Sequence, residues 1–308
     1  MGRNDGGQLG NGATANLATP VQVLAAGKAL AAGREHSVVL KQDGTLWSSG
    51  KNSSGQLGSS GVAQRSAFAQ IATDVAALAA GELTTGFVRA DSTLWMTGSN
   101  FNHGALGEGT YISRSSPVQV ASDVAQVACG TVFTTFVSRG GDLWGMGFNE
   151  AGQLPDGSAV LVTRPALVSA QVAHFDLSGG GALSMVVKAD GSGWAAGRNF
   201  NADLADGTSI NRSSLVPVAS GVSAAGTGWY HGFWLRADGT VLGAGVNAVG
   251  QLGDGTTAWA GTPRPVANGV TFADGGETHS LWLKQDGSLW TMGANFRAAS
   301  VKSSISGG

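Results

Sequence analysis

Residues 30–58 read LAAGREHSVVLKQDGTLWSSGKNSSGQLG, and this stretch decides the fold because the rest of the chain repeats it. One Asn marks the same register position in every copy, at intervals of 48 to 50 residues. The seven marks are Asn4, Asn52, Asn100, Asn149, Asn199, Asn247 and Asn295. They enclose six units, and a fixed period of this length indicates a repeat architecture and a single domain, although the chain has 308 residues.

Every unit has the pattern of a small antiparallel sheet. In the first copy, the β-rich runs 36–41 and 45–49 meet across Asp43-Gly44. This dipeptide predicts a hairpin with a type I′ turn, in which both central residues need positive φ. The apolar runs Pro20 to Leu24 and Lys28 to Ala32 predict two more strands. Because no segment follows the helical period of about 3.6 residues over three turns, we predict an all-β fold.

Such a unit cannot bury both faces of its own sheet, so we expect each unit to stack on the next. A β-propeller does this by closing the row of units into a ring. The chain begins with the G-Q-L-G half of a unit, and its last unit ends with the strand half, Leu289 to Asn295. We therefore predict one propeller, residues 1–296, with six four-stranded blades of about 48–50 residues, closed by N- and C-terminal segments that share one blade. Residues 297–308 match nothing in the unit, and we expect a flexible tail.

The repeat resembles that of the regulator of chromosome condensation family. The resemblance rests on a Trp strand, a Gly three residues after the Trp, and a G-Q-L-G turn, which is clearest at Gly55–Gly58, Gly152–Leu154 and Gly250–Gly253. It implies a β-propeller used as a recognition surface. Members of this family act as an exchange factor for a small GTPase, as chromatin-bound docking platforms, as ubiquitin-ligase substrate modules and, in bacteria, as a β-lactamase inhibitor or as surface proteins. Because family propellers usually have seven blades, a seven-bladed ring lacking one unit is the alternative.

The composition narrows the classes of partner. A net charge of −2, a pI near 6.2 and the absence of any run of Lys or Arg give no electrostatic reason to approach a phosphate backbone, so we expect no nucleic acid partner. No apolar stretch reaches the length of about 18 residues that spans a bilayer, and we expect no membrane insertion. Cys129 is the only cysteine, so no internal disulfide can form. We expect a soluble monomer. The sequence does not fix the cellular compartment, and a secreted or cell-surface location is compatible with it.

The sequence contains no recognisable catalytic set. It has no G-x-S-x-G, no H-E-x-x-H and no phosphate-binding loop, so we predict a protein that is not an enzyme and needs no cofactor. His36, His231 and His279 share one repeat position, and in a closed ring their three blades are neighbours. They could converge on a metal ion, but a histidine that belongs to the repeat and bonds within its own blade explains them better. We therefore predict no metal site.

Positions that differ between the repeat units, while the scaffold residues recur, are the best guide to a binding surface. One variable set is the turn before the His position, which carries Trp229 and Tyr230 in one unit. Trp and Tyr are favoured interface anchors, so this pair is the leading candidate for a binding hot spot. Packing of both rings between blades is an alternative of equal weight. In other units the same turn carries the charged candidates Arg34, Glu35, Glu82 and Glu277.

The other variable set is the long loop after the G-Q-L-G turn. Arg65, Arg114 and Arg212 share one register position in it. We expect them to bond carbonyls of the neighbouring blade, and the alternative is a mildly basic arc for an acidic partner. Tyr111 and Trp259 are further points of contact for a partner. The rings that follow the register Asn in alternate units are expected in the core between blades, at Phe101, Phe200 and Phe296.

These observations favour a non-enzymatic, protein-binding or scaffold propeller that recognises a protein through variable loops on one face. One alternative is an enzyme, or a carbohydrate- or metal-binding propeller, with a site at the channel mouth around the three histidines. Another is a structural module of a larger secreted bacterial protein.

Overall fold

The computed structural model describes residues 1–177 and 182–294 of the chain. The predictions for Asn295, Phe296 and the tail 297–308 lie outside these residues. Within the described ranges the regular structure is all β, with strands numbered β1 to β23. No helix in this part of the chain has the length and apolar character needed to cross a membrane.

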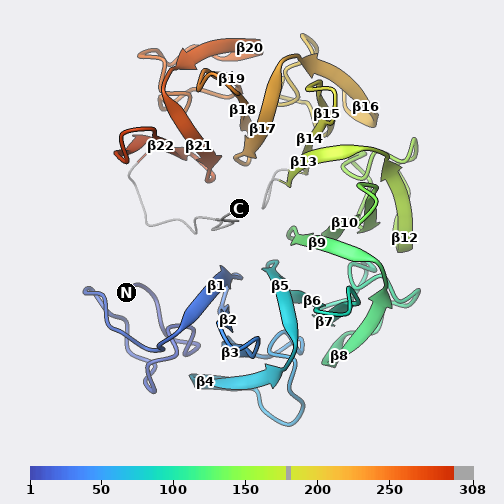
Figure 1. The fold of residues 1–308 in the computed structure, drawn as a ribbon, viewed down its shortest axis with the longest axis vertical. Helices are drawn as coiled ribbons and strands as arrows, with labels where there is room; N and C mark the ends of the chain where they lie inside the picture. The colour runs from blue at the N-terminus through green and yellow to red at the C-terminus, as the bar shows by residue number, and fades with distance from the viewer. Residues whose placement is uncertain (178–181, 295–308) are drawn as a thin grey trace.

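The strands form six antiparallel sheets, each made of consecutive strands and arranged around a common centre (Figure 1). The first two sheets hold β1 (Gly27–Ala32), β2 (His36–Lys41), β3 (Leu46–Lys51) and β4 (Gln64–Ala72), then β5 (Val75–Ala80), β6 (Thr84–Arg89), β7 (Leu94–Gly98) and β8 (Arg114–Ala121). The third and fourth hold β9 (Val124–Cys129), β10 (Phe133–Ser138), β11 (Leu143–Gly147) and β12 (Val162–Ser169), then β13 (Val172–Leu177), β14 (Leu183–Lys188), β15 (Gly193–Gly197) and β16 (Arg212–Ala219). The last two hold β17 (Val222–Thr227), β18 (His231–Arg236), β19 (Val241–Gly245) and β20 (Ala260–Ala267), then β21 (Val270–Gly275), β22 (His279–Lys284) and β23 (Leu289–Gly293). The predicted propeller of about six blades is confirmed.

The hairpin between the second and third strands of each blade differs from the predicted type I′ turn. Gly44 has a φ of 79°, but Asp43 is not among the residues with positive φ. The Gly44 amide donates to the Lys41 carbonyl, and the Asp43 carboxylate accepts hydrogen bonds from the amide and the hydroxyl of Thr45. The turn is therefore a three-residue connection whose Gly occupies the left-handed position. The prediction was wrong because Asp43 does not take positive φ; its side chain instead caps the backbone of Thr45, two residues later.

The hydrophobic core lies between the blades. Leu40 and Leu46 of the first blade form one buried cluster with Val75 and Phe87 of the second. Similar clusters lie between later blades. Stacking of neighbours therefore stabilises every sheet, as expected for units that cannot bury both faces alone.

The sixth sheet differs from the prediction because only three of its strands lie within the described residues. Residues 18–26, which precede β1, belong to no strand. Figure 1 shows a gap between the sixth sheet and β1, with the N-terminal segment beside it. Leu289 of β23 is 65% exposed, whereas its repeat equivalents Leu46 and Leu94 are 0% exposed. Among the described residues, the N-terminal segment and the sixth sheet thus do not form the shared blade that would close the ring.

Candidate functional site

Both variable loop sets lie on one face of the propeller. In a four-stranded antiparallel meander, the turn between the first two strands and the loop between the last two lie at the same end of the sheet. We call this end the loop face. It comprises the turns 33–35, 81–83, 130–132, 228–230 and 276–278 and the long loops 52–63, 99–113, 148–161, 198–211 and 246–259.

The register Asn holds each long loop in shape. In the fifth blade, Oδ1 of Asn247 accepts from the Leu252 amide at 2.9 Å, and Nδ2 donates to the carbonyls of Thr256 and Ala258 at 3.0 and 3.2 Å. Asn247 is fully buried, and Asn52 and Asn199 make the corresponding bonds in their own loops. One Asn side chain therefore hydrogen-bonds both the early and the late part of each loop. The outer residues of the loop are not needed for these bonds and can vary.

The arginines of the long loops bond within their own loops. Arg114 pairs with Glu108 at 2.9 Å, Arg212 pairs with Asp206 at 2.7 Å, and Nη2 of Arg65 donates to the Ser59 hydroxyl at 2.7 Å. These contacts replace the expected bonds to carbonyls of the neighbouring blade. They also argue against a basic arc, because the charges of Arg114 and Arg212 are compensated locally. The acidic partners six residues earlier in the chain were the sequence signal for this pairing.

Large apolar side chains are exposed on the loop face. Phe101 is 68% exposed and Phe200 is 70% exposed, so the prediction that these rings lie in the core between blades was wrong. Each ring sits on the first turn of a long loop, beyond the buried register Asn, where the chain has already left the sheet. The exposed apolar residues of this face span four consecutive blades: Phe101, Tyr111, Ile112, Val160, Phe200, Ile210, Val249 and Trp259. We call them the apolar arc.

Trp229 and Tyr230 lie half-buried in the turn between β17 and β18. Their rings meet edge to face with centroids 6.2 Å apart, and the Arg198 guanidinium lies 4.5 Å from the Tyr230 ring centroid. Arg198 also donates to the Trp229 carbonyl at 3.2 Å and faces the Asp203 carboxylate at 3.7 Å. Burial raises the pKa of Asp203 to about 6, against the opposing effect of Arg198. The predicted hot spot is therefore a packed cluster between the fourth and fifth blades, and Arg198 and Asp203 are members that the sequence did not single out.

Among the charged residues of the short turns, Arg34, Glu35 and Glu82 form ion pairs of their own. Arg34 forms an ion pair with Glu82 of the next blade, and Glu35 pairs with Lys51 at 2.8 Å. Glu277 is exposed. The candidates of this turn set thus spread around the loop face and do not form one site.

The repeat-position histidines join neighbouring blades. Nε2 of His36 lies 3.0 Å from the Thr85 hydroxyl of the second blade, and that hydroxyl donates to the Gln56 carbonyl. Its oxygen must then accept from Nε2–H of a neutral His36. Burial lowers the pKa of His36 to about 4. The bond therefore crosses to the next blade and not within one blade as expected, because stacking brings the next hydroxyl to the ring.

His231 repeats this arrangement with Ser280, at 2.7 Å. Burial again dominates, and it lowers the pKa of His231 to about 3. His279 holds the same position in the sixth blade, next to the gap. Within residues 1–177 and 182–294, no three His, Cys, Asp or Glu side chains gather in a way that could hold a metal ion.

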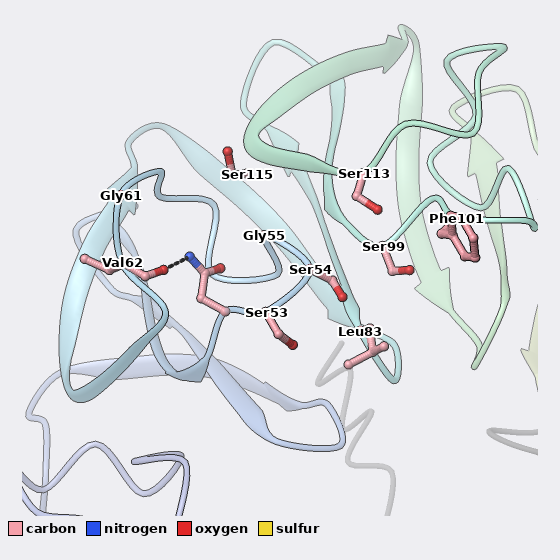
Figure 2. A pocket seen from close by; sticks show the side chains of 11 residues that line it. Ser53, Ser54, Gly55, Gly61, Val62, Leu83, Ser99, Phe101, Ser113 and Ser115 are labelled. Atoms are coloured by element: carbon pink, nitrogen blue, oxygen red, sulfur yellow. Dashed lines mark hydrogen bonds between the residues drawn. The ribbon is translucent and has the colours of Figure 1, made fainter.

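An open hollow of about 580 Å³ lies on the loop face between the first two blades (Figure 2). Figure 2 shows Ser53, Ser54 and Ser99 along it, with Phe101 of the apolar arc at one end. Its lining residues carry no charged side chain. The hollow is therefore an uncharged depression next to an exposed aromatic ring.

Comparisons with known proteins agree with this fold. Two sequence models of the regulator of chromosome condensation (RCC1) repeat match residues 1–40 and 28–56. The structure is similar to yeast RCC1 (Prp20) in its complex with Kap60, with a TM-score of 0.73 and 17% identity over 86% of this chain and 69% of that one. It is also similar to human WBSCR16, with a TM-score of 0.71 and 23% identity over 83% of this chain and 71% of that one. No match to a curated protein sequence was found. The six sheets and these similarities show a propeller fold like that of RCC1, and the family models identify RCC1 repeats within residues 1–56.

Proposed function

We propose that the protein is a non-enzymatic propeller that binds a protein partner on its loop face. The observation that carries this proposal is the apolar arc, which presents large apolar side chains over four consecutive blades. Scattered single apolar residues are normal on a protein surface, but a set gathered on one face marks an interaction site. Aromatic side chains among them are the residue types that anchor protein interfaces.

The electrostatics of the loop face favour an apolar contact over a charged one. Several arginines beside the long loops pair with loop carboxylates: Arg114 with Glu108, Arg212 with Asp206 and Arg264 with Asp254. A partner would therefore meet rings and aliphatic groups between compensated charges. We expect its affinity to change little with salt concentration, because screening acts mainly on uncompensated charges.

Two of the similar structures are of a propeller for which binding to other proteins is described. One is yeast Prp20 bound to Kap60, and the other study describes the binding of Prp20p from Saccharomyces cerevisiae to Gsp1p and histones, with a TM-score of 0.72 and 18% identity over 86% of this chain and 71% of that one. These similarities support a protein-binding role for this chain without indicating the partner. An expected monomer and the absence of a catalytic role belong to the same proposal.

A capture experiment with matched variants tests the proposal. The double variant Phe101→Ser/Phe200→Ser removes two exposed rings of the apolar arc. The control Leu167→Ser removes an apolar side chain that is 49% exposed on the outer strand β12, away from the loop face. Wild type and control should retain the same protein from a lysate of the source organism, as identified by mass spectrometry, and the double variant should lose it. Equal retention by all three proteins would contradict the proposal.

A further inference from the structure

The hollow between the first two blades gathers serine hydroxyls that the fold does not use. Ser53 and Ser54 come from the long loop of the first blade, and Ser99 and Ser115 come from the second blade. Within residues 1–177 and 182–294, none of these four hydroxyls has a hydrogen-bond partner in the protein. Each hydroxyl can therefore donate one hydrogen bond to a ligand and accept others from it.

An exposed aromatic ring ends this row of hydroxyls. Figure 2 shows Ser54 and Ser99 between Ser53 on one side and the Phe101 ring on the other. The ring is 68% exposed, so it is accessible to a ligand in the hollow. An aromatic ring beside hydroxyl groups suits a molecule that combines an apolar C–H face with hydroxyls of its own, and a sugar ring has this combination.

The residues that line the hollow carry no charge, and the repeat shows that this neutrality is particular to one place. The second exposed ring at the Phe101 position is Phe200, two blades further on. There the positions that correspond to Ser53 and Ser99 carry Glu150 and Arg198. A charged ligand would lose hydration in the serine-lined hollow without gaining an ion pair. The hollow therefore favours a neutral ligand.

Register asparagines hold both walls of the hollow. Nδ2 of Asn52 donates to the Val62 carbonyl at 2.7 Å, the bond drawn in Figure 2. In the second blade, the backbone amide of Asn100 donates to the Ser113 hydroxyl at 3.1 Å, which leaves the proton of that hydroxyl for a ligand. A ligand would meet walls that are already ordered, which lowers the entropic cost of binding. The volume of about 580 Å³ lies within the range of about 300–1,000 Å³ that is typical of small-ligand sites.

We propose that this hollow binds a neutral saccharide, with Phe101 stacked on the apolar face of a sugar ring and with Ser53, Ser54 and Ser99 bonded to sugar hydroxyls. This inference goes beyond the protein binding proposed above and does not depend on it. Because the hollow is open and each hydrogen bond to the sugar replaces one to water, we expect weak, millimolar binding.

Saturation-transfer difference NMR with defined ligands tests this inference. The probes are four neutral trisaccharides, namely maltotriose, cellotriose, mannotriose and chitotriose, together with a capped pentapeptide of glycine and serine. We expect at least one trisaccharide to bind the wild type. Phe101→Ala should weaken this binding by about tenfold or more, because it removes the stacking ring. Ser99→Arg should also weaken it, because it places in the hollow the charged residue that the repeat has at Arg198.

Phe200→Ala is the matched control, because Phe200 has the same repeat position as Phe101 and is 70% exposed. It should bind the saccharide as the wild type does, and melting temperatures check that all three variants are folded. Failure of all four trisaccharides to bind the wild type would overturn the proposal. Binding that survives both Phe101→Ala and Ser99→Arg, or an equal loss in Phe200→Ala, would also overturn it. Binding of the peptide alone would assign the hollow to a polypeptide and reject the saccharide.

Discussion

Single buried residues link one blade to the next, and their titration makes this linkage sensitive to pH. The pKa of His36 is lowered to about 4 and that of His231 to about 3, in both cases by burial. Because the unfolded chain takes up protons near pH 6.5 and the folded state resists them, stability is full above pH 6.5 and is lost as pH falls toward 3 to 4. The variant His231→Gln keeps an N–H donor for Ser280 but cannot titrate.

We therefore expect denaturant unfolding of His231→Gln to show a smaller loss of stability between pH 6.5 and 4 than wild type, by a few kcal/mol. A variant curve parallel to that of wild type would contradict the assigned role of His231.

Asp203 has the opposite pH dependence. Its pKa is raised from 3.8 to about 6 by burial, so the folded state prefers the protonated carboxyl, and stability is lost as pH rises from about 4 to 6. Asp203→Asn should raise the free energy of unfolding at pH 7.5 by about 2–3 kcal/mol and change it little at pH 4. The exposed Glu150→Gln is the surface control. A destabilised Asp203→Asn at pH 7.5 would show that the ion pair with Arg198 outweighs the cost of burial.

At the scale of elements, one Asn per unit maintains the long loops that carry the candidate site. Asn247→Ala leaves the buried Leu252 amide and two loop carbonyls without partners, and we expect a loss of about 1–3 kcal/mol in unfolding free energy. The exposed Asn268→Ala is the matched control. Both values are measured by denaturant titration. Equal unfolding free energies of the two variants would mean that the long loop keeps its conformation without the Asn247 side chain.

The repeat of 48 to 50 residues predicted the positions of the strands better than it predicted the contacts of their side chains. Strand positions and blade number follow from spacing and from Gly and Trp placement, which local chemistry fixes. The turn at Asp43-Gly44 could not be typed from the dipeptide, because Thr45 decides where the Asp side chain bonds. Phe101 and Phe200 were predicted in the core between blades, but both rings are exposed. Recurrence at one repeat position does not tell whether that position lies inside the sheet or in the loop beyond its end. Trp229 and Tyr230 were found by variation alone, but their anchor Arg198 lies in a different unit and is near them only after stacking.

At the scale of the whole molecule, the described residues form six sheets around a common centre, and the proposed binding surface lies on one face. The sequence predicted that the two ends complement each other, and the uncovered Leu289 and Val23 agree with that expectation without showing closure. The apolar arc lies on blades two to five, away from the gap. We therefore expect closure to affect the stability of the ring and not the identity of the partner.

The dissociation constant of the captured partner tests the central claim most directly, measured with wild type, Phe101→Ser/Phe200→Ser and Leu167→Ser at low and high salt. Aromatic anchors at interfaces commonly contribute about 2 kcal/mol or more each, so the double variant should bind at least about tenfold more weakly, the control should match wild type, and salt should change little. An unchanged dissociation constant in the double variant, or an equal loss in the control, would contradict binding through the loop face.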